Sequence, residues 1–132
     1  MVFALLRNTS QIIIVVKSYI IYTGGGVIGI PQQSIYSASK HAVLGMTKSA
    51  ALEYAKSGIR INAIASSLVE TEMVERVSEH NKQLIESLKS GTLIGRIGDP
   101  QEIANALVWL LSYKASFVLG HTLLVDGGIV SR

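Results

Sequence analysis

An unbroken apolar run, Ile12–Val16, limits what this chain can fold into more than any other feature of its sequence. A strand that faces solvent on one side alternates apolar and polar side chains, whereas a strand covered on both faces does not. A second run of β-branched and aromatic residues, Tyr19–Tyr22, ends at the glycine-rich loop Thr23–Gly26. Both runs predict buried strands of a parallel sheet.

A long helix and another strand are expected next. The segment from Tyr36 to about Lys56 has no proline and one glycine. Its apolar or small side chains recur at the spacing of one helix face: Val43, Met46, Ala50 and Tyr54. Gly58 stands where a left-handed helix stop is expected, and Ile59–Ala65 then predicts a short buried strand.

The rest of the chain continues this alternation. Thr71–Ser90 is charged and helical in tendency. Asp99–Glu102, with the sequence DPQE, predicts a helix start: Asp as N-cap, Pro at the first turn and Glu three residues after the cap. That helix runs to about Tyr113, and Thr122–Val125 is the last strand. The order strand, helix, strand, helix, strand predicts an α/β fold with a parallel sheet.

Composition excludes several classes of protein. The chain has 132 residues, 48% of them hydrophobic and 16% charged, which fits one globular domain or a piece of one. Its net charge of +3 comes from scattered single bases, so nucleic-acid binding is not expected. Without cysteine there is no disulfide or thiolate metal site, and three scattered histidines do not form a metal site either.

No membrane span is expected, and the composition is compatible with a cytoplasmic protein. The longest apolar stretch, Ile12–Tyr22, is interrupted by Lys17 and Ser18. It is shorter than the roughly 18–20 residues that a span requires. The apolar segment Met1–Lys17 leaves a membrane-surface protein open as a further interpretation. Trp109, among leucines and a valine, is expected in the core.

Tyr36 and Lys40, within the sequence YSASK, are the residues whose spacing suggests chemistry. Four residues is slightly more than one helical turn, so both side chains leave the same helix face. A phenol is a poor acid–base catalyst at neutral pH, but a neighbouring ammonium group favours the phenolate. Such a pair suits proton transfer to or from an alcohol or carbonyl oxygen. Spacing alone leaves a purely structural pair open.

Two longer stretches add context to this pair. GIPQQSIYSASKHAVLGMTKSAALEYAKSGIRINAIA and GDPQEIANALVWLLSYKASFVLGHTLLVDGG resemble the short-chain dehydrogenase/reductase family. The resemblance runs from about Ser18 to Ile129. It implies the C-terminal half of a doubly wound dinucleotide-binding sheet. Residues 18–132 are accordingly expected to form that half, after a leader of residues 1–17 that does not match the family.

The resemblance implies roles for five residues. Tyr36 matches the family's catalytic tyrosine, and Lys40 matches the lysine that favours the phenolate and holds the nicotinamide ribose hydroxyls. Thr23, thirteen residues before Tyr36, stands where the family has a serine that hydrogen-bonds the substrate oxygen, and threonine keeps the hydroxyl. Val69 and Thr71 match residues that bind the nicotinamide carboxamide. The cofactor implied is NAD or NADP, and the substrate is a small alcohol or ketone.

Two departures from the family pattern bear on cofactor binding. Ser66 and Ser67 replace the family's Pro-Gly pair, and a lost glycine matters where the backbone needs unusual dihedrals or where the cofactor approaches it closely. Thr23–Ile30, TGGGVIGI, has the wrong spacing for the phosphate-binding glycine fingerprint and lies too near Tyr36. We interpret Gly24–Gly26 as the loop after the catalytic strand.

Besides the membrane-surface interpretation, two functions remain open. The first is an NAD(P)-dependent oxidoreductase that is truncated, and therefore weakly active or inactive as this chain. The second is a non-catalytic association module that oligomerises through the Tyr36 helix and the C-terminal strand, with small residues allowing close approach: Ala42, Gly45, Ala50 and Ala51. Either function is compatible with a homo-oligomer.

Overall fold

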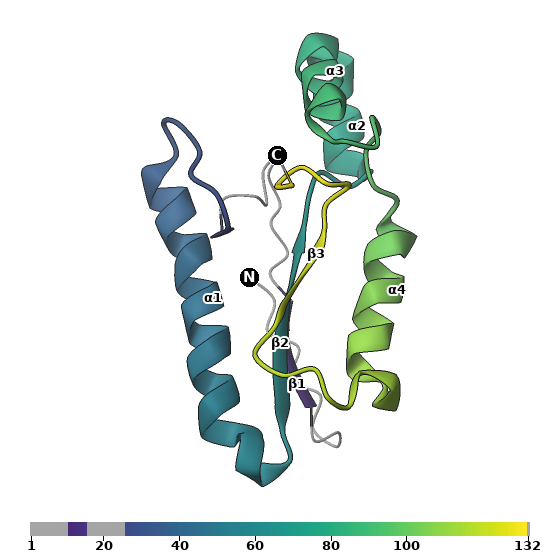
Figure 1. Ribbon diagram of the computed structural model, residues 1–132. Helices are drawn as coiled ribbons and strands as arrows, with labels where there is room; N and C mark the ends of the chain where they lie inside the picture. Colours follow the sequence, from purple (N-terminus) through teal and green to yellow (C-terminus); the bar gives the residue numbers. More distant parts are fainter. Residues whose placement is uncertain (1–10, 16–25, 132) are drawn as a thin grey trace.

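The computed structural model describes residues 11–15 and 26–131, apart from the side chains of residues 11–15 and of a few helical residues. Three strands form one parallel sheet in the order β1 (Gln11–Val15), β2 (Arg60–Ser66) and β3 (Thr122–Val125). Figure 1 shows the helices on both sides of this sheet. The predicted α/β fold with a parallel sheet is confirmed, and the last strand has the predicted bounds.

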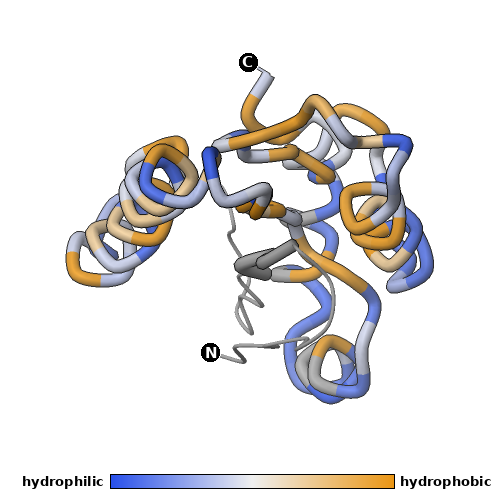
Figure 2. The backbone as a smooth tube through the Cα atoms, turned by 90° about the horizontal axis from the view of Figure 1, so that it is seen from below, coloured by the Kyte–Doolittle hydropathy of each residue, from blue (hydrophilic) through white to orange (hydrophobic). Residues whose placement is uncertain are grey.

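The sheet lies between two long helices. Helix α1 (Ser34–Tyr54) covers one face of the sheet and α4 (Pro100–Leu111) covers the other, as the view along the strands in Figure 2 shows. The chain moves across the sheet in one direction, from β1 to β2 to β3, yet passes on opposite faces. The two crossovers therefore have opposite hands, and the β2–α4–β3 crossover is the left-handed exception to the usual rule.

The central strand provides most of the core. In β2, residues 61–65 are all buried, because α1 packs on one side and α4 on the other. Ile64 packs with Leu110 of α4 and with Ala115, which follows in the short 3-10 helix η3 (Tyr113–Ala115). Leu110 has no exposed surface. Burial of a leucine or isoleucine side chain contributes roughly 1.5–3 kcal/mol each, so this cluster is a main source of stability.

Two polar residues of β2 have structural partners. The Arg60 guanidinium donates to the carbonyl oxygens of Leu110 (2.8 Å) and Ser112 (3.2 Å), which caps the end of α4. The Asn62 amide donates to the carbonyl of Val118 at 2.9 Å and accepts from the N–H of His121 at 3.0 Å. Both side chains thus fasten the segment that leads from α4 into β3 to the central strand.

The helical segment after β2 divides into two helices, α2 (Glu72–His80) and α3 (Lys82–Gly91). They stand together beyond the carboxyl ends of the strands in Figure 1. The long helix α1 ends at Tyr54 and continues as the 3-10 helix η2 (Ala55–Ser57). Gly58 then adopts φ 73°, which confirms the predicted left-handed stop.

The predicted inner face of α1 is partly wrong. Met46 and Tyr54 are 49% and 44% exposed, while the buried positions form another stripe: Ser37, Val43, Thr47 and Ala51. Apolar and small residues surround most of this helix, so the sequence period does not select one face. Trp109 was also expected in the core but is 40% exposed, because Leu110 is the position of α4 that is fully buried.

Strand β1 lies one residue earlier than the predicted Ile12–Val16, and within the segment 1–17 predicted to be a leader. It pairs with β2 from Gln11–Arg60 to Val15–Ile64, so it belongs to the same sheet as the rest of the domain. The predicted strand Tyr19–Tyr22 falls outside the described residues. Within the described residues, no helix combines the length and apolarity needed to cross a bilayer.

Candidate active site

The candidate site lies at the carboxyl edge of the sheet. Helix α1 runs antiparallel to the strands, so its first turns stand at the end where β2 and β3 finish (Figure 1). Tyr36 and Lys40 belong to these first two turns. In open α/β sheets, ligands bind in the crevice outside the carboxyl ends of the strands. The fold therefore puts the predicted Tyr–Lys pair where a ligand would be expected.

Tyr36 and Lys40 contact each other. The Lys40 Nζ lies 5.2 Å from the centroid of the Tyr36 ring, within the range of a cation–π interaction. Both side chains are half-buried. Burial lowers the pKa of Lys40 from its ordinary value, because removal from water disfavours the ammonium form. The helical spacing thus brings the two groups together, as the sequence predicts.

Gly26, in the loop that leads into α1, lies against Lys40. A Cβ atom at Gly26 would lie 3.4 Å from both the Cβ and the carbonyl oxygen of Lys40. The absence of a side chain therefore lets this loop approach α1 closely. Thr23, the predicted partner for a substrate oxygen, and the neighbouring Gly24 lie outside the described residues. Their predicted roles stay predictions.

Val69 and Thr71 occupy the loop between β2 and α2. Val69 is half-buried and makes an isolated parallel bridge with Gly98. Thr71 is exposed, and its Oγ1 accepts from the N–H of Val74 at 3.4 Å at the start of α2. A hydroxyl that accepts one hydrogen bond keeps its own hydrogen for another. The Thr71 hydroxyl can thus donate one further hydrogen bond, and its predicted role toward the cofactor stays a prediction.

The Ser66–Ser67 replacement brings no left-handed backbone strain. Among the described residues, Gln32 is the one non-glycine with positive φ, at 64°. Ser66 pairs with Val125 of β3, and the N–H of Ser67 donates to the carbonyl of Val125 at 3.4 Å. The alternative that the lost glycine requires unusual dihedrals is therefore wrong, because β2 extends to Ser66 and Ser67 still bonds to β3. The alternative that the cofactor approaches this position closely stays a prediction.

The turn after β3 completes this edge. The buried Asp126 carboxylate accepts from the N–H groups of Gly128 (2.9 Å) and Val130 (3.2 Å). The Gly127 carbonyl accepts from the N–H of Leu93 at 2.9 Å, in the loop after α3. The contact of this turn with Leu93 was not predicted, since no local sequence pattern signals it. No group of three His, Cys, Asp or Glu within the described ranges is arranged to hold a metal ion.

A parallel sheet covered by helices on both faces, with candidate ligand-binding side chains at its carboxyl edge, is the architecture of the doubly wound α/β folds. A sequence model described as Enoyl-(Acyl carrier protein) reductase matches residues 2–130. This match begins inside the segment predicted to be a separate leader; the domain boundary itself stays a prediction. The chain belongs to the short-chain dehydrogenase/reductase family, which confirms the predicted resemblance.

Individual relatives support this assignment. The chain is 44% identical over 109 residues to a 2,5-dichloro-2,5-cyclohexadiene-1,4-diol dehydrogenase of Sphingobium indicum, covering 83% of this chain and 44% of that protein. It is 49% identical over 104 residues to an A-factor type gamma-butyrolactone 1'-reductase of Streptomyces virginiae, covering 79% of this chain and 40% of that protein. The chain spans less than half the length of these curated relatives.

Solved structures also support the assignment to the short-chain dehydrogenase/reductase family. The structure of ElxO with NADP bound matches with a TM-score of 0.81 and 30% identity, covering 92% of this chain and 47% of that one. A 4-hydroxyisoleucine dehydrogenase complexed with NADH matches with a TM-score of 0.80 and 32% identity, again over 92% of this chain and 47% of that one. Both similar structures hold a nicotinamide cofactor.

Proposed function

We propose that this chain carries the proton-transfer part of an NAD(P)-dependent oxidoreductase that interconverts a secondary alcohol and a ketone. The observation that carries the proposal is the Lys40 ammonium 5.2 Å from the Tyr36 ring centroid, at the carboxyl edge of the sheet. Support also comes from the names of the relatives, which describe a diol dehydrogenase and a lactone 1'-reductase.

Each candidate residue has a chemical task in this proposal. The Tyr36 hydroxyl donates a proton to the ketone oxygen, or accepts one from the alcohol. Lys40 favours the phenolate and holds ribose hydroxyls, while Thr23 donates a hydrogen bond to the substrate oxygen. Val69 and Thr71 contact the nicotinamide carboxamide. When bound, NAD or NADP supplies or accepts the hydride.

Cofactor binding is tested by nuclear magnetic resonance of the labelled chain, titrated separately with NADH and NADPH. Shift changes are expected at the amides of Lys40, Val69 and Thr71. Lys40→Met should abolish them, whereas the matched control Lys48→Met, on the exposed side of the same helix, should retain them. Absence of shifts with both cofactors, or equal effects of the two variants, would contradict the proposed binding site.

Catalysis is tested with a panel of ketones and NADH or NADPH. The glycine fingerprint for the pyrophosphate has no counterpart in this sequence, so we expect little or no turnover from the isolated chain. Any activity above background should disappear in Tyr36→Phe and persist in Tyr54→Phe, a matched change on the same helix. Turnover that survives in Tyr36→Phe would exclude Tyr36 as the acid–base group.

A second candidate function is the non-catalytic association module. Ile35 and Leu52 of α1 are 86% and 82% exposed, and apolar surface of this kind favours self-association. Light scattering at several protein concentrations, with the double variant Ile35→Ser/Leu52→Ser as comparison, tests it. A mass that rises with concentration in the wild type alone supports a homo-oligomer built on α1. A monomer at every concentration excludes it.

A further inference from the structure

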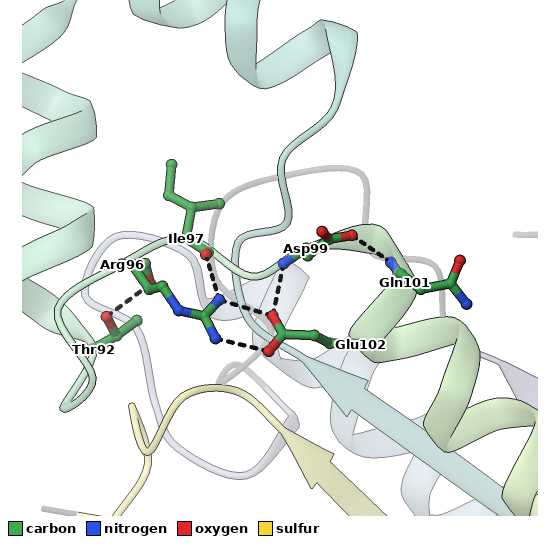
Figure 3. A network of polar contacts seen from close by, with 6 residues as sticks. All are labelled: Thr92, Arg96, Ile97, Asp99, Gln101 and Glu102. Atoms are coloured by element: carbon green, nitrogen blue, oxygen red, sulfur yellow. Dashed lines mark hydrogen bonds and ion pairs between the residues drawn. The ribbon is translucent and has the colours of Figure 1, made fainter.

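Arg96 and Glu102 form a paired contact just before and inside the first turn of α4. Arg96 Nη1 donates to Glu102 Oε2 at 2.8 Å, and Nη2 donates to Oε1 at 2.7 Å. Figure 3 shows the guanidinium and the carboxylate facing each other with both bonds drawn. Two parallel bonds between planar groups fix the orientation of both side chains.

The same two side chains hold the backbone between them. Glu102 Oε2 also accepts from the N–H of Asp99 at 2.8 Å, and this completes the capping box that the sequence predicted. Arg96 Nη1 also donates to the carbonyl oxygen of Ile97 at 3.2 Å. Ile97 and Asp99 are thus each tied to the ion pair (Figure 3). Gly98, which lies between them, is held on both sides.

Gly98 connects this ion pair to the candidate cofactor loop. Its N–H donates to the carbonyl of Leu68 at 3.0 Å, and its carbonyl accepts from the N–H of Glu70 at 2.9 Å. These two bonds lie on either side of Val69. A Cβ atom at Gly98 would lie 3.9 Å from both Glu102 Oε2 and Val69 Cγ2. The carboxylate and the Val69 side chain therefore flank one glycine.

The exposure of the ion pair indicates that it orders the nearby backbone and contributes little to the stability of the whole fold. The Arg96 and Glu102 side chains are 53% and 43% exposed, and exposed ion pairs contribute little to overall stability. The hydrogen bonds from Arg96 and from the Asp99 N–H lower the pKa of Glu102 to about 2. The carboxylate is thus ionised, and the contact intact, throughout the neutral range.

We infer that Arg96 and Glu102 are positioning residues for the segment Val69–Thr71, acting through the two hydrogen bonds of Gly98. The inference rests on the proposed function, in which Val69 and Thr71 contact the nicotinamide carboxamide. In this inference Arg96 and Glu102 act through the backbone and not by contact with the cofactor. They fix the backbone whose side chains contact the nicotinamide.

Amide hydrogen exchange tests the inference directly. In Arg96→Gln, the Glu70 and Gly98 amides should exchange at least about tenfold faster, while the core amide of Ala63, bonded to the His121 carbonyl at 2.8 Å, should change by less than about twofold. Glu102→Gln, which keeps an oxygen for the Asp99 N–H, provides a second variant and should show the same selective increase. Exchange that stays unchanged at Glu70 and Gly98, or rises equally at Ala63, would overturn the inference.

A matched control and a cofactor measurement complete the design. Arg76→Gln removes another exposed ion pair, with Glu72 on α2, and should leave Glu70 and Gly98 exchange unchanged. On addition of NADH, Arg96→Gln should lose the shifts at Val69 and Thr71 but keep the shift at Lys40. If the wild type shows no shift with either cofactor, the proposed function fails, whereas hydrogen exchange still decides whether Arg96 and Glu102 order this segment.

Discussion

Replacement of Gly128 by alanine perturbs the contact between the turn after β3 and the loop after α3. Gly128 has φ 81°, and a Cβ atom there would lie 2.8 Å from Leu93 Cδ1 and 3.0 Å from Leu93 Cβ. The first of these atoms is at the end of a flexible side chain, but the second is not. Alanine therefore requires Leu93 to move.

Two effects of Gly128→Ala lower the free energy of unfolding. A left-handed conformation costs a residue with a Cβ roughly 1–2 kcal/mol. Displacement of Leu93 also strains the hydrogen bond that its N–H donates to the Gly127 carbonyl at 2.9 Å. We expect Gly128→Ala to reduce the free energy of unfolding by about 1–3 kcal/mol.

Gly45 provides the matched control. It lies inside α1, and a Cβ atom there would have no neighbour within 4 Å. Since alanine stabilises a helix interior relative to glycine, Gly45→Ala should raise the free energy of unfolding by about 0.5–1 kcal/mol. Both variants are measured by urea unfolding at two protein concentrations, with the slopes compared. A Gly128→Ala protein as stable as the wild type would refute the reasoning.

Three further predictions concern the core, the end of α4 and its start. Leu110→Ala should lower the free energy of unfolding in urea by about 2–5 kcal/mol, because the leucine is fully buried. Val108 lies on the same helix and is 65% exposed, so Val108→Ala should have little effect. Equal losses in the two variants would contradict this view of the core. Arg60→Met should lower the free energy of unfolding by about 1–3 kcal/mol, since it removes the donors to the Leu110 and Ser112 carbonyls. It should also speed amide hydrogen exchange in the last turn of α4. Unchanged exchange in that turn would argue against the capping role of Arg60. The pKa of Glu102 is lowered from 4.5 to about 2 on folding, so its stabilising contribution is present above pH 4.5 and is lost as the pH falls toward 2. Glu102→Gln should lack this part of the dependence of the unfolding free energy on pH. Identical pH profiles of the wild type and the variant would count against the Arg96 contact.

Much of the candidate site could be predicted from local sequence. Tyr36 and Lys40 are four residues apart on one helix, and helical geometry alone brings such side chains together. The capping box at Asp99 and Glu102 is also local, since its hydrogen bonds span three residues. The contact between Gly98 and Val69 was not predicted, because no short pattern relates residues so far apart in the chain.

The sequence by itself determined the alternation of strands and helices, the capping box of α4, the stop at Gly58, the spacing of the Tyr–Lys pair and the family, because each is encoded by periodicity or by short motifs. The tertiary structure alone decided which side of α1 faces inward, with Thr47 and Ala51 buried in place of Met46 and Tyr54. It also placed α1 and α4 on opposite faces of the sheet and joined Gly98 to the Val69 loop. These features depend on packing between distant segments, where the partner surface, rather than the local period, selects the face that is buried.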